Sequence, residues 1–264
     1  MLERALLQRL ERRAQEVQAL LDQNGGSWEE TFYQVLARSF GFKVNAEPFF
    51  QLARTLPLKI ILKQSGNRQQ IEALLLGQAG FLDAPKGDEY YQKLRREYAL
   101  LLQKYSLHRA KMSKSQWRFM RLRPANFPVL RLAQLGAVLQ GGRVLFSNVL
   151  ESEHIDTLYN LLTARPSSYW EDHYQFSRKT KTGAHELGKS SMDGIIANTI
   201  VPFWVAYGKR IDDQHFIDKA VRVLQQLAAE ENRITRMWKD VGVNTSTPFD
   251  SQALLELFNN FCRM

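Results

Sequence analysis

Residues Gly188 to Arg210 read GKSSMDGIIANTIVPFWVAYGKR and form the most apolar segment of the chain. Ser190 and Asp193 have the spacing of a capping box, and a glycine followed by two basic residues suits the C-terminus of a helix. Between these ends, apolar side chains cover most of the circumference, as they do in a buried helix. The segment therefore predicts a central core helix over residues 188–208 of an all-helical protein.

A proline interrupts this predicted helix. Pro202 lacks the N–H group that would bond the carbonyl of Asn198, so we expect the helix to kink there. The freed carbonyl needs a donor or a water, and a kinked core helix is the simpler interpretation; a small polar pocket beside Asn198 is the functional one. The uncharged run Gly194–Gly208 is shorter than the roughly 20 residues of a membrane span, so no membrane association is predicted.

In the rest of the chain, amphipathic stretches are separated by Gly, Pro and Asn residues, which favour helix ends and turns. This pattern predicts a compact multi-helix globular array of roughly ten helices with no significant sheet. Asn45, for example, is expected to cap a short helix. No long linker divides the chain, so we expect a single all-helical domain over residues 1–264, either undivided or as two packed lobes of about 1–107 and 108–264.

Composition places the protein in a broad class. Of its 264 residues, 44% are hydrophobic and 24% charged, as in soluble globular proteins. A lone cysteine, Cys262, cannot form an internal disulfide and fits a reducing compartment, so a cytoplasmic location is expected. The five histidines show no metal-ligand spacing, and no nucleophile–base pair stands out. We therefore predict no metal, no cofactor and no catalytic residue, and an enzyme within this chain alone is the less favoured alternative.

The net charge of +9 is confined to one segment. Ala99–Leu150 contains nine basic residues and no acidic one, while the remaining 27 basic and 27 acidic side chains cancel. A localised basic segment favours an anionic partner such as nucleic acid or an acidic protein. Trp117 and Phe119 could stack on bases, although their helical spacing favours the core. The candidate phosphate-binding residues of this segment are Lys111, Lys114, Arg118, Arg121, Arg123 and Arg131.

A second candidate for anion binding precedes the predicted core helix. Residues 183–190 match the phosphate-loop pattern G-x-x-x-x-G-K-[ST]. The preceding residues are polar, so the hydrophobic strand that this motif requires is missing. A weaker form of the hypothesis keeps only the helix N-terminus and nearby cations as an anion site. Its candidate residues are Lys179, Lys181, Lys189 and Ser190.

Several phrases together resemble an uncharacterised bacterial family, known mainly from Bacteroidetes and catalogued only as a domain of unknown function. They are WEE at 28–30, ARSFGFK at 37–43, QIEAL at 70–74, GQAGFL at 77–82, RLRPANFP at 121–128 and LGKSS at 187–191. The resemblance covers nearly the whole chain and implies no established activity. It implies that relatives carry a strand-rich N-terminal portion and a cysteine-containing tail resembling a metal site. This chain would then match the helical C-terminal part.

Three functional hypotheses remain open from the sequence. The first is a helical binding module whose basic face contacts nucleic acid or another polyanion. The second is a scaffold that docks an N-terminal domain absent from this chain or a protein partner, because the helix predicted over residues 2–23 carries only a thin apolar stripe. The third is a small-anion or nucleotide enzyme at residues 183–190.

Overall fold

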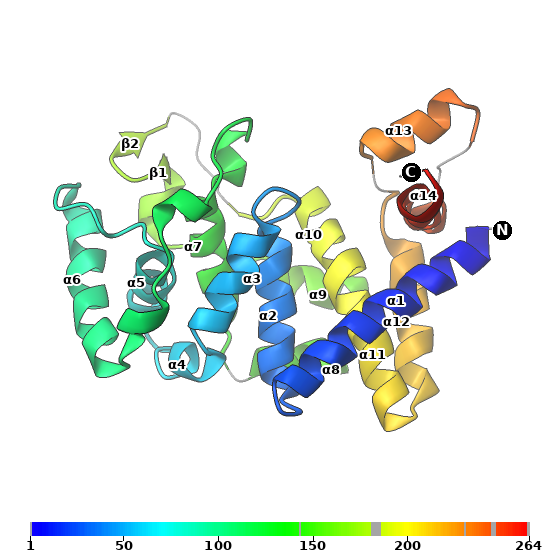
Figure 1. The fold of residues 1–264 in the computed structure, drawn as a ribbon, viewed down its shortest axis with the longest axis horizontal. Coiled ribbons are helices and arrows are strands. Elements are labelled where there is room, and N and C mark those ends of the chain that lie inside the picture. The colour runs from blue at the N-terminus through cyan, green and yellow to red at the C-terminus, as the bar shows by residue number, and fades with distance from the viewer. Residues whose placement is uncertain (1, 143, 181–185, 230, 244–246, 263–264) are drawn as a thin grey trace. The chain divides into compact units, whose positions relative to one another are not determined.

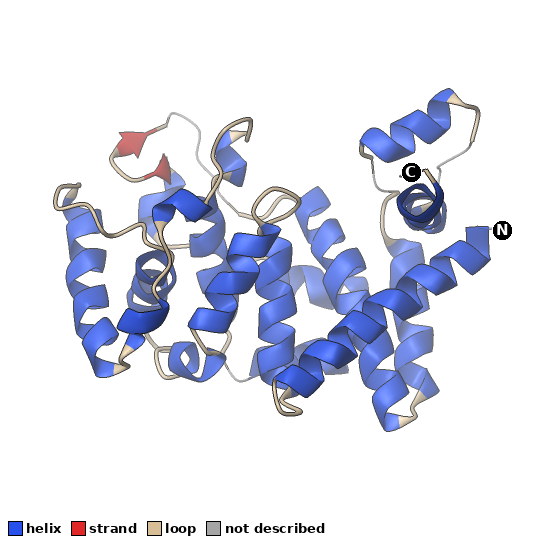
Figure 2. Cartoon of the chain, in the orientation of Figure 1, coloured by secondary structure: helices blue, strands red, loops and turns tan. Residues whose placement is uncertain are grey.

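A computed structural model describes residues 2–142, 144–180, 186–229, 231–243 and 247–262 (Figure 1). The described residues form fourteen α-helices and one short antiparallel pair of strands, β1 (His173–Gln175) and β2 (Arg178–Lys179) (Figure 2). The prediction of a predominantly all-α fold is therefore confirmed. None of the described helices combines the length and the apolarity needed to cross a bilayer.

The chain groups into two compact units, and each unit combines segments that are far apart in the sequence. Unit 1 contains Met1–Thr31, Ser152–Leu158 and Gly188–Met264, and unit 2 contains Phe32–Glu151 and Tyr159–Leu187. Two of the four boundaries fall inside helices, namely α2 (Trp28–Phe40) and α9 (Ile155–Leu162).

Unit 1 is built around the apolar stripe of its N-terminal helix. Leu6, Leu10, Val17 and Leu20 of α1 are all buried, because α1 packs along both α11 and α14. Further contacts within the unit join α11 to α12, α12 to α14 and α13 to α14. Its helices are α1 (Leu2–Gln23), α10 (Lys189–Ile195), α11 (Val201–Ile211), α12 (Gln214–Gln226), α13 (Arg233–Asp240) and α14 (Pro248–Phe261).

The predicted core helix is present but interrupted. Between α10 and α11, residues Ile196–Ile200 form a π-helical turn, in which the N–H of Val201 bonds the carbonyl of Ile196. The interruption lies immediately before Pro202, as its missing N–H group leads one to expect. Phe203 and Trp204 are both 0% exposed, so this segment does lie in the core of its unit.

The predicted ends of this helix are wrong. Gly188, not Ser190, precedes the first helical residue, and no side chain caps it. Ser190 therefore lies inside the first turn and is exposed. At the other end the helix continues to Ile211 and stops at Asp212, which adopts a left-handed conformation. Gly208 has a different role: a Cβ there would lie 2.7 Å from the carbonyl oxygen of Asp213, so glycine permits the close turn into α12.

Unit 2 places two helices at its centre. Every residue of α7 and residues 71–78 of α5 are buried, and α5 packs against both α6 and α7. The sequence indicated one central helix, over residues 188–208. The structure has a second one, because α7 is the buried central helix of unit 2. Besides most of α2 and part of α9, the helices of this unit are α3 (Ala46–Thr55), α4 (Leu58–Leu62), α5 (Arg68–Gln78), α6 (Glu89–Lys104), α7 (Pro128–Leu139) and α8 (Val144–Glu151).

Candidate functional site

The acid-free segment contains the connector between α6 and α7, residues 105–127, which we call the basic connector. Prolines and irregular spacing prevent a long helix here, and three short 3₁₀ turns form instead. Trp117 anchors the connector: it is 5% exposed, and its indole N–H donates to the carbonyl of Ala79 at 2.9 Å. Phe119 packs edge-on against Phe81. The core interpretation of Trp117 is confirmed, so its ring cannot stack on a base.

Four of the six predicted phosphate-binding residues of this segment remain open to solvent. They are exposed, and no carboxylate within the described part of the chain lies within ion-pair distance of them. Arginine can present two parallel donors to a phosphate, and lysine a compact point charge. These four side chains are Lys114, Arg118, Arg121 and Arg123.

Two of the predicted phosphate-binding residues are engaged elsewhere. Lys111 pairs with the carboxylate of Asp83. Arg131 lies in the fully buried helix α7 and is 5% exposed. Its guanidinium donates to Asn126 at 2.6 Å and lies 4.5 Å above the ring of Phe42, and burial lowers its pKa to about 10. Arg131 therefore braces the connector from inside and is not part of its exposed face.

The structure adds a neighbouring loop that the sequence did not indicate. Asn45 makes no capping hydrogen bond with α3, contrary to the prediction. Its buried amide instead accepts from the N–H of Arg118 and donates to the carbonyl of Arg118, both at 2.9 Å. These two hydrogen bonds between the Asn45 amide and the main chain of Arg118 hold the loop 41–45 against the basic connector. Lys43 belongs to this loop, is exposed and has no ion pair with any described residue.

The second predicted anion site is not assembled by the described residues. Lys181 and residues 183–185 lie outside the described part of the chain. Lys179 pairs with Asp172 at 3.2 Å, and Lys189 pairs with Asp193 at 3.3 Å in the next turn of α10. These two lysines also belong to different units. No group of three or more His, Cys, Asp or Glu among the described residues could hold a metal ion.

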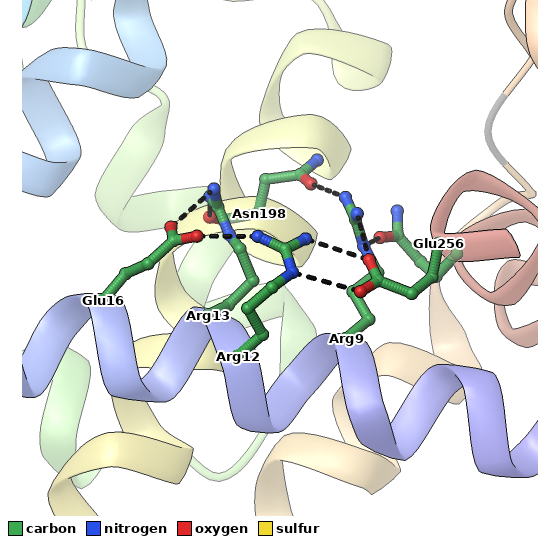
Figure 3. A network of polar contacts seen from close by, with 7 residues as sticks. Arg9, Arg12, Arg13, Glu16, Asn198 and Glu256 are labelled. Carbon is green, nitrogen blue, oxygen red and sulfur yellow. Dashed lines mark hydrogen bonds and ion pairs between the residues drawn. The ribbon is translucent and has the colours of Figure 1, made fainter. Parts of the chain in front are cut away.

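Unit 1 contains a polar network around Asn198 (Figure 3). The main-chain carbonyl of Asn198, which Pro202 leaves without its helical partner, accepts from Nη2 of Arg13 at 2.7 Å. The side-chain oxygen of Asn198 accepts from Arg9 at 3.1 Å, and its amide donates to Gly194 at 3.0 Å. The predicted freed carbonyl is therefore real, and arginine side chains of α1 occupy the space expected to be a polar pocket.

The same arginines converge on a buried carboxylate of α14 (Figure 3). Glu256 is 1% exposed and accepts from Arg12 at 2.9 and 3.1 Å and from Arg9 at 3.4 Å. The hydrogen bond to Glu256 raises the pKa of Arg12. On the solvent side, Glu16 accepts from Arg12 at 2.7 Å and from Arg13 at 3.3 Å. Because these guanidinium groups are shared among protein oxygens, the network joins α1, α14 and the π-helical turn.

Unit 2 contains a buried carboxylate whose hydrogen bonds within the described residues come from neutral donors. Glu72 of α5 is 0% exposed and accepts from the hydroxyl of Tyr90 at 2.7 Å, the indole of Trp170 at 2.9 Å, and the N–H and hydroxyl of Ser167 at 3.0 and 3.1 Å. Burial raises the pKa of Glu72, although these donors oppose the shift. The carboxylate thus holds the 3₁₀ turn Ser168–Glu171 against α5.

Asp88, at the start of α6, organises the other side of this cluster. It accepts from the N–H of Tyr91 at 2.8 Å, the hydroxyl of Tyr169 at 2.6 Å and the N–H of Ser177 at 2.7 Å. Partial burial acts to raise its pKa, but the hydrogen bonds outweigh it and hold the pKa below its ordinary value. The ring of Tyr169 stacks on that of His173 with centroids 4.0 Å apart, so aromatic packing accompanies these hydrogen bonds.

Comparison with known proteins identifies a family but no function. Residues 1–233 match the family described as "Protein of unknown function (DUF2851)". No curated protein and no solved structure matches the chain. Any function therefore has to be inferred from the residues themselves.

Proposed function

Because the chain belongs to the DUF2851 family, whose function is unknown, we propose from its own residues that it is a helical module that binds nucleic acid or a similar polyanion through the basic connector. The observation that carries this proposal is the exposure of Lys114, Arg118, Arg121 and Arg123, within ten consecutive residues, without a carboxylate partner in the described chain. Phosphate binding needs cations that are free to replace counterions, and these four meet that condition.

The surroundings of the basic connector support the proposal. Like charges close together repel one another, so an uncompensated cluster costs stability unless a ligand neutralises it. The cluster is also held in place by Trp117 and Asn45 rather than carried on a loose tail. Pre-positioned donors lose less conformational entropy on binding than free side chains do. Lys43 adds one further exposed cation, in the adjoining loop 41–45.

The other two hypotheses have less support. The stripe of α1 that suggested a docking surface is buried within unit 1, so it no longer motivates a missing partner. Lys189 and Ser190, which suggested a nucleotide site, lie in a helix of only seven residues, and Lys189 is paired. A polyanion-binding role needs no cofactor. We also propose a cytoplasmic location, because the single cysteine suits a reducing compartment.

Binding measured against salt concentration tests the proposal. The chain should bind a labelled DNA duplex at low salt, with an affinity that falls with a log–log slope of about −3 to −4 for four phosphate contacts. The triple variant Arg118→Ala, Arg121→Ala, Arg123→Ala should reduce the magnitude of that slope by about 2 to 3. No binding at low salt would refute the proposal.

A matched control separates a site from general charge. Lys93, Arg95 and Arg96 of α6 are also exposed, belong to the same unit and have no ion pair with a described residue. Replacing these three by Ala lowers the net charge by the same amount. If this control weakens binding as much as the connector variant does, the contact is not made by the basic connector.

A further inference from the structure

Two loops of unit 2 are joined into one surface. Residues 41–45 follow α2, residues 118–123 belong to the basic connector, and the two hydrogen bonds between Asn45 and the main chain of Arg118 tie them together. We call these two segments the paired loops. Arg131 supports them from below, because its guanidinium lies over Phe42 of one loop and bonds Asn126, just beyond the other.

Both paired loops hold a non-glycine residue in the left-handed region of the backbone. Phe42 has a φ of 48° and Arg121 a φ of 62°. In the second loop, the N–H of Leu122 bonds the carbonyl of Phe119 at 3.3 Å, so Met120 and Arg121 form the tip of a tight turn. A turn with positive φ at its third position favours glycine. An arginine in this conformation costs about 1 kcal/mol relative to glycine.

One of the two residues at the tip of this turn is a large apolar side chain that is open to solvent. Met120 is 84% exposed, the largest value among the exposed large hydrophobic side chains of the described residues. Phe42 and Val44 of the partner loop are 37% and 40% exposed, so three of the nine side chains in that class lie on the paired loops. Isolated exposed apolar residues are common, but here they alternate with cations. Those cations are Lys43, Arg118, Arg121 and Arg123.

Exposed apolar side chains among cations restrict the kind of polyanion that these loops can bind. The inference rests on the proposed function, which is polyanion binding by the basic connector. Phosphate contacts alone would explain the cations but not Met120 at the apex. A single-stranded ligand would need aromatic faces for stacking. Trp117 is buried, Phe119 packs edge-on against Phe81, and the Arg131 guanidinium lies over one face of the partly exposed Phe42 ring. Proteins that bind the minor groove of DNA combine arginine with an apolar wedge, methionine included, that separates two base steps.

We infer that the paired loops bind duplex DNA through its minor groove. Met120 enters between two base steps, and Arg121 lies beside it in the groove, where the narrow width strengthens the negative potential. Arg118 and Arg123, which flank the turn, contact the phosphates on either side. Duplex RNA has a wide, shallow minor groove and fits this geometry less well.

The test compares nucleic acids and single substitutions in the full 264-residue chain. Fluorescence anisotropy measures binding to an AT-rich DNA duplex of about 20 base pairs, a duplex RNA and a single strand, and energy transfer between labelled duplex ends measures bending. Met120→Ala should weaken duplex DNA binding about tenfold and abolish bending, with less than about twofold change for the single strand. Met120→Leu should keep both properties, because an apolar wedge remains.

Leu100→Ala is the matched control, because Leu100 is 66% exposed in the same unit but lies on α6. If Met120→Ala behaves like Leu100→Ala while the wild-type chain still binds nucleic acid, the wedge is refuted and the proposed polyanion binding stands. If the wild-type chain binds no nucleic acid at low salt, both fall. If Met120 is instead needed for binding to anionic vesicles and the duplex stays straight, the inference is overturned in favour of a membrane surface.

Discussion

Arg13 donates from Nη2 to the main-chain carbonyl of Asn198 at 2.7 Å, although the two residues are 185 positions apart. In a regular helix that carbonyl would accept from residue 202, which is proline. The N-terminal helix thus supplies the donor that Pro202 cannot. The π-helical turn contains Asn198, and α1 packs along α11, which follows the turn. We therefore expect the interruption in the core of unit 1 and the position of α1 to depend on one another.

We predict that Arg13→Ala lowers the free energy of unfolding by about 1–3 kcal/mol, because a partly buried carbonyl loses its donor. Pro202→Ala restores an N–H group that can bond Asn198 within the helix. In the Pro202→Ala background, Arg13→Ala should therefore cost less than half as much. Urea denaturation of the two single variants and the double variant measures this coupling, and strictly additive effects would contradict it.

Glu256 and Glu16 offer a comparison between a buried and an exposed carboxylate that share Arg12. Glu256→Ala should cost about 3 kcal/mol or more, because it leaves Arg9, whose side chain is 12% exposed, without its carboxylate. Glu16→Ala should cost less than about 1 kcal/mol, because solvent screens an ion pair whose two side chains are 42% and 44% exposed. Equal thermal shifts in the two variants would show that burial does not decide the strength of this network.

Local sequence patterns predicted the elements well and their partners poorly. The proline at 202 was enough to predict an orphaned carbonyl at Asn198, since both groups belong to one helix. No local pattern could indicate Arg13 as its donor. Asn45 is a residue type that often caps helices. Its amide instead bonds the main chain of Arg118, which lies 73 residues later in the sequence. The sequence shows which side chains are polar, whereas their hydrogen-bond partners depend on the tertiary fold.

The basic segment shows the same division. Its charge could be counted from the sequence, but the exposed subset could not. Lys111 meets Asp83, which lies 28 residues earlier, and Arg131 is buried on a helix whose every position is covered. No sequence pattern indicated the loop Gly41–Asn45, because it becomes part of the candidate surface only through the hydrogen bonds of Asn45 to Arg118. The acid-free stretch therefore predicts where basic residues are concentrated, while the tertiary contacts of Lys111 and Arg131 decide which of them stay exposed.

Glu72 predicts a pH dependence of stability. Its folded-state pKa is raised by burial, so its stabilising contribution is fully present below the unfolded value of 4.5 and is lost as pH rises through the folded pKa. Glu72→Gln removes that titration. The stability of the wild-type chain minus that of Glu72→Gln should thus decrease as pH rises from acidic towards neutral. Thermal denaturation over this range measures the difference, and a constant or rising value would contradict the prediction.

Two glycines inside helices should respond to alanine in opposite ways. A Cβ at Gly77 would lie 2.1 Å from the ring of Tyr98, which is buried and bonds Gln78. Gly77→Ala should therefore destabilise by about 1–3 kcal/mol or more through overpacking. At Gly194 in α10, nothing lies within 4 Å of the added Cβ, so Gly194→Ala should stabilise by about 0.5–1 kcal/mol. Chemical denaturation of both variants distinguishes these effects.

Arg121 links backbone strain to the proposed binding surface. Arg121→Gly relieves the φ of 62°, so it should raise stability by up to about 1 kcal/mol while weakening DNA binding through the lost cation. Arg121→Ala keeps the strain and loses the same charge, so it should weaken binding equally without gaining stability. Paired measurements of melting temperature and of binding at one salt concentration separate the two terms. If both variants bind as tightly as the wild-type chain, Arg121 makes no contact with the ligand, and the strained turn serves only the fold.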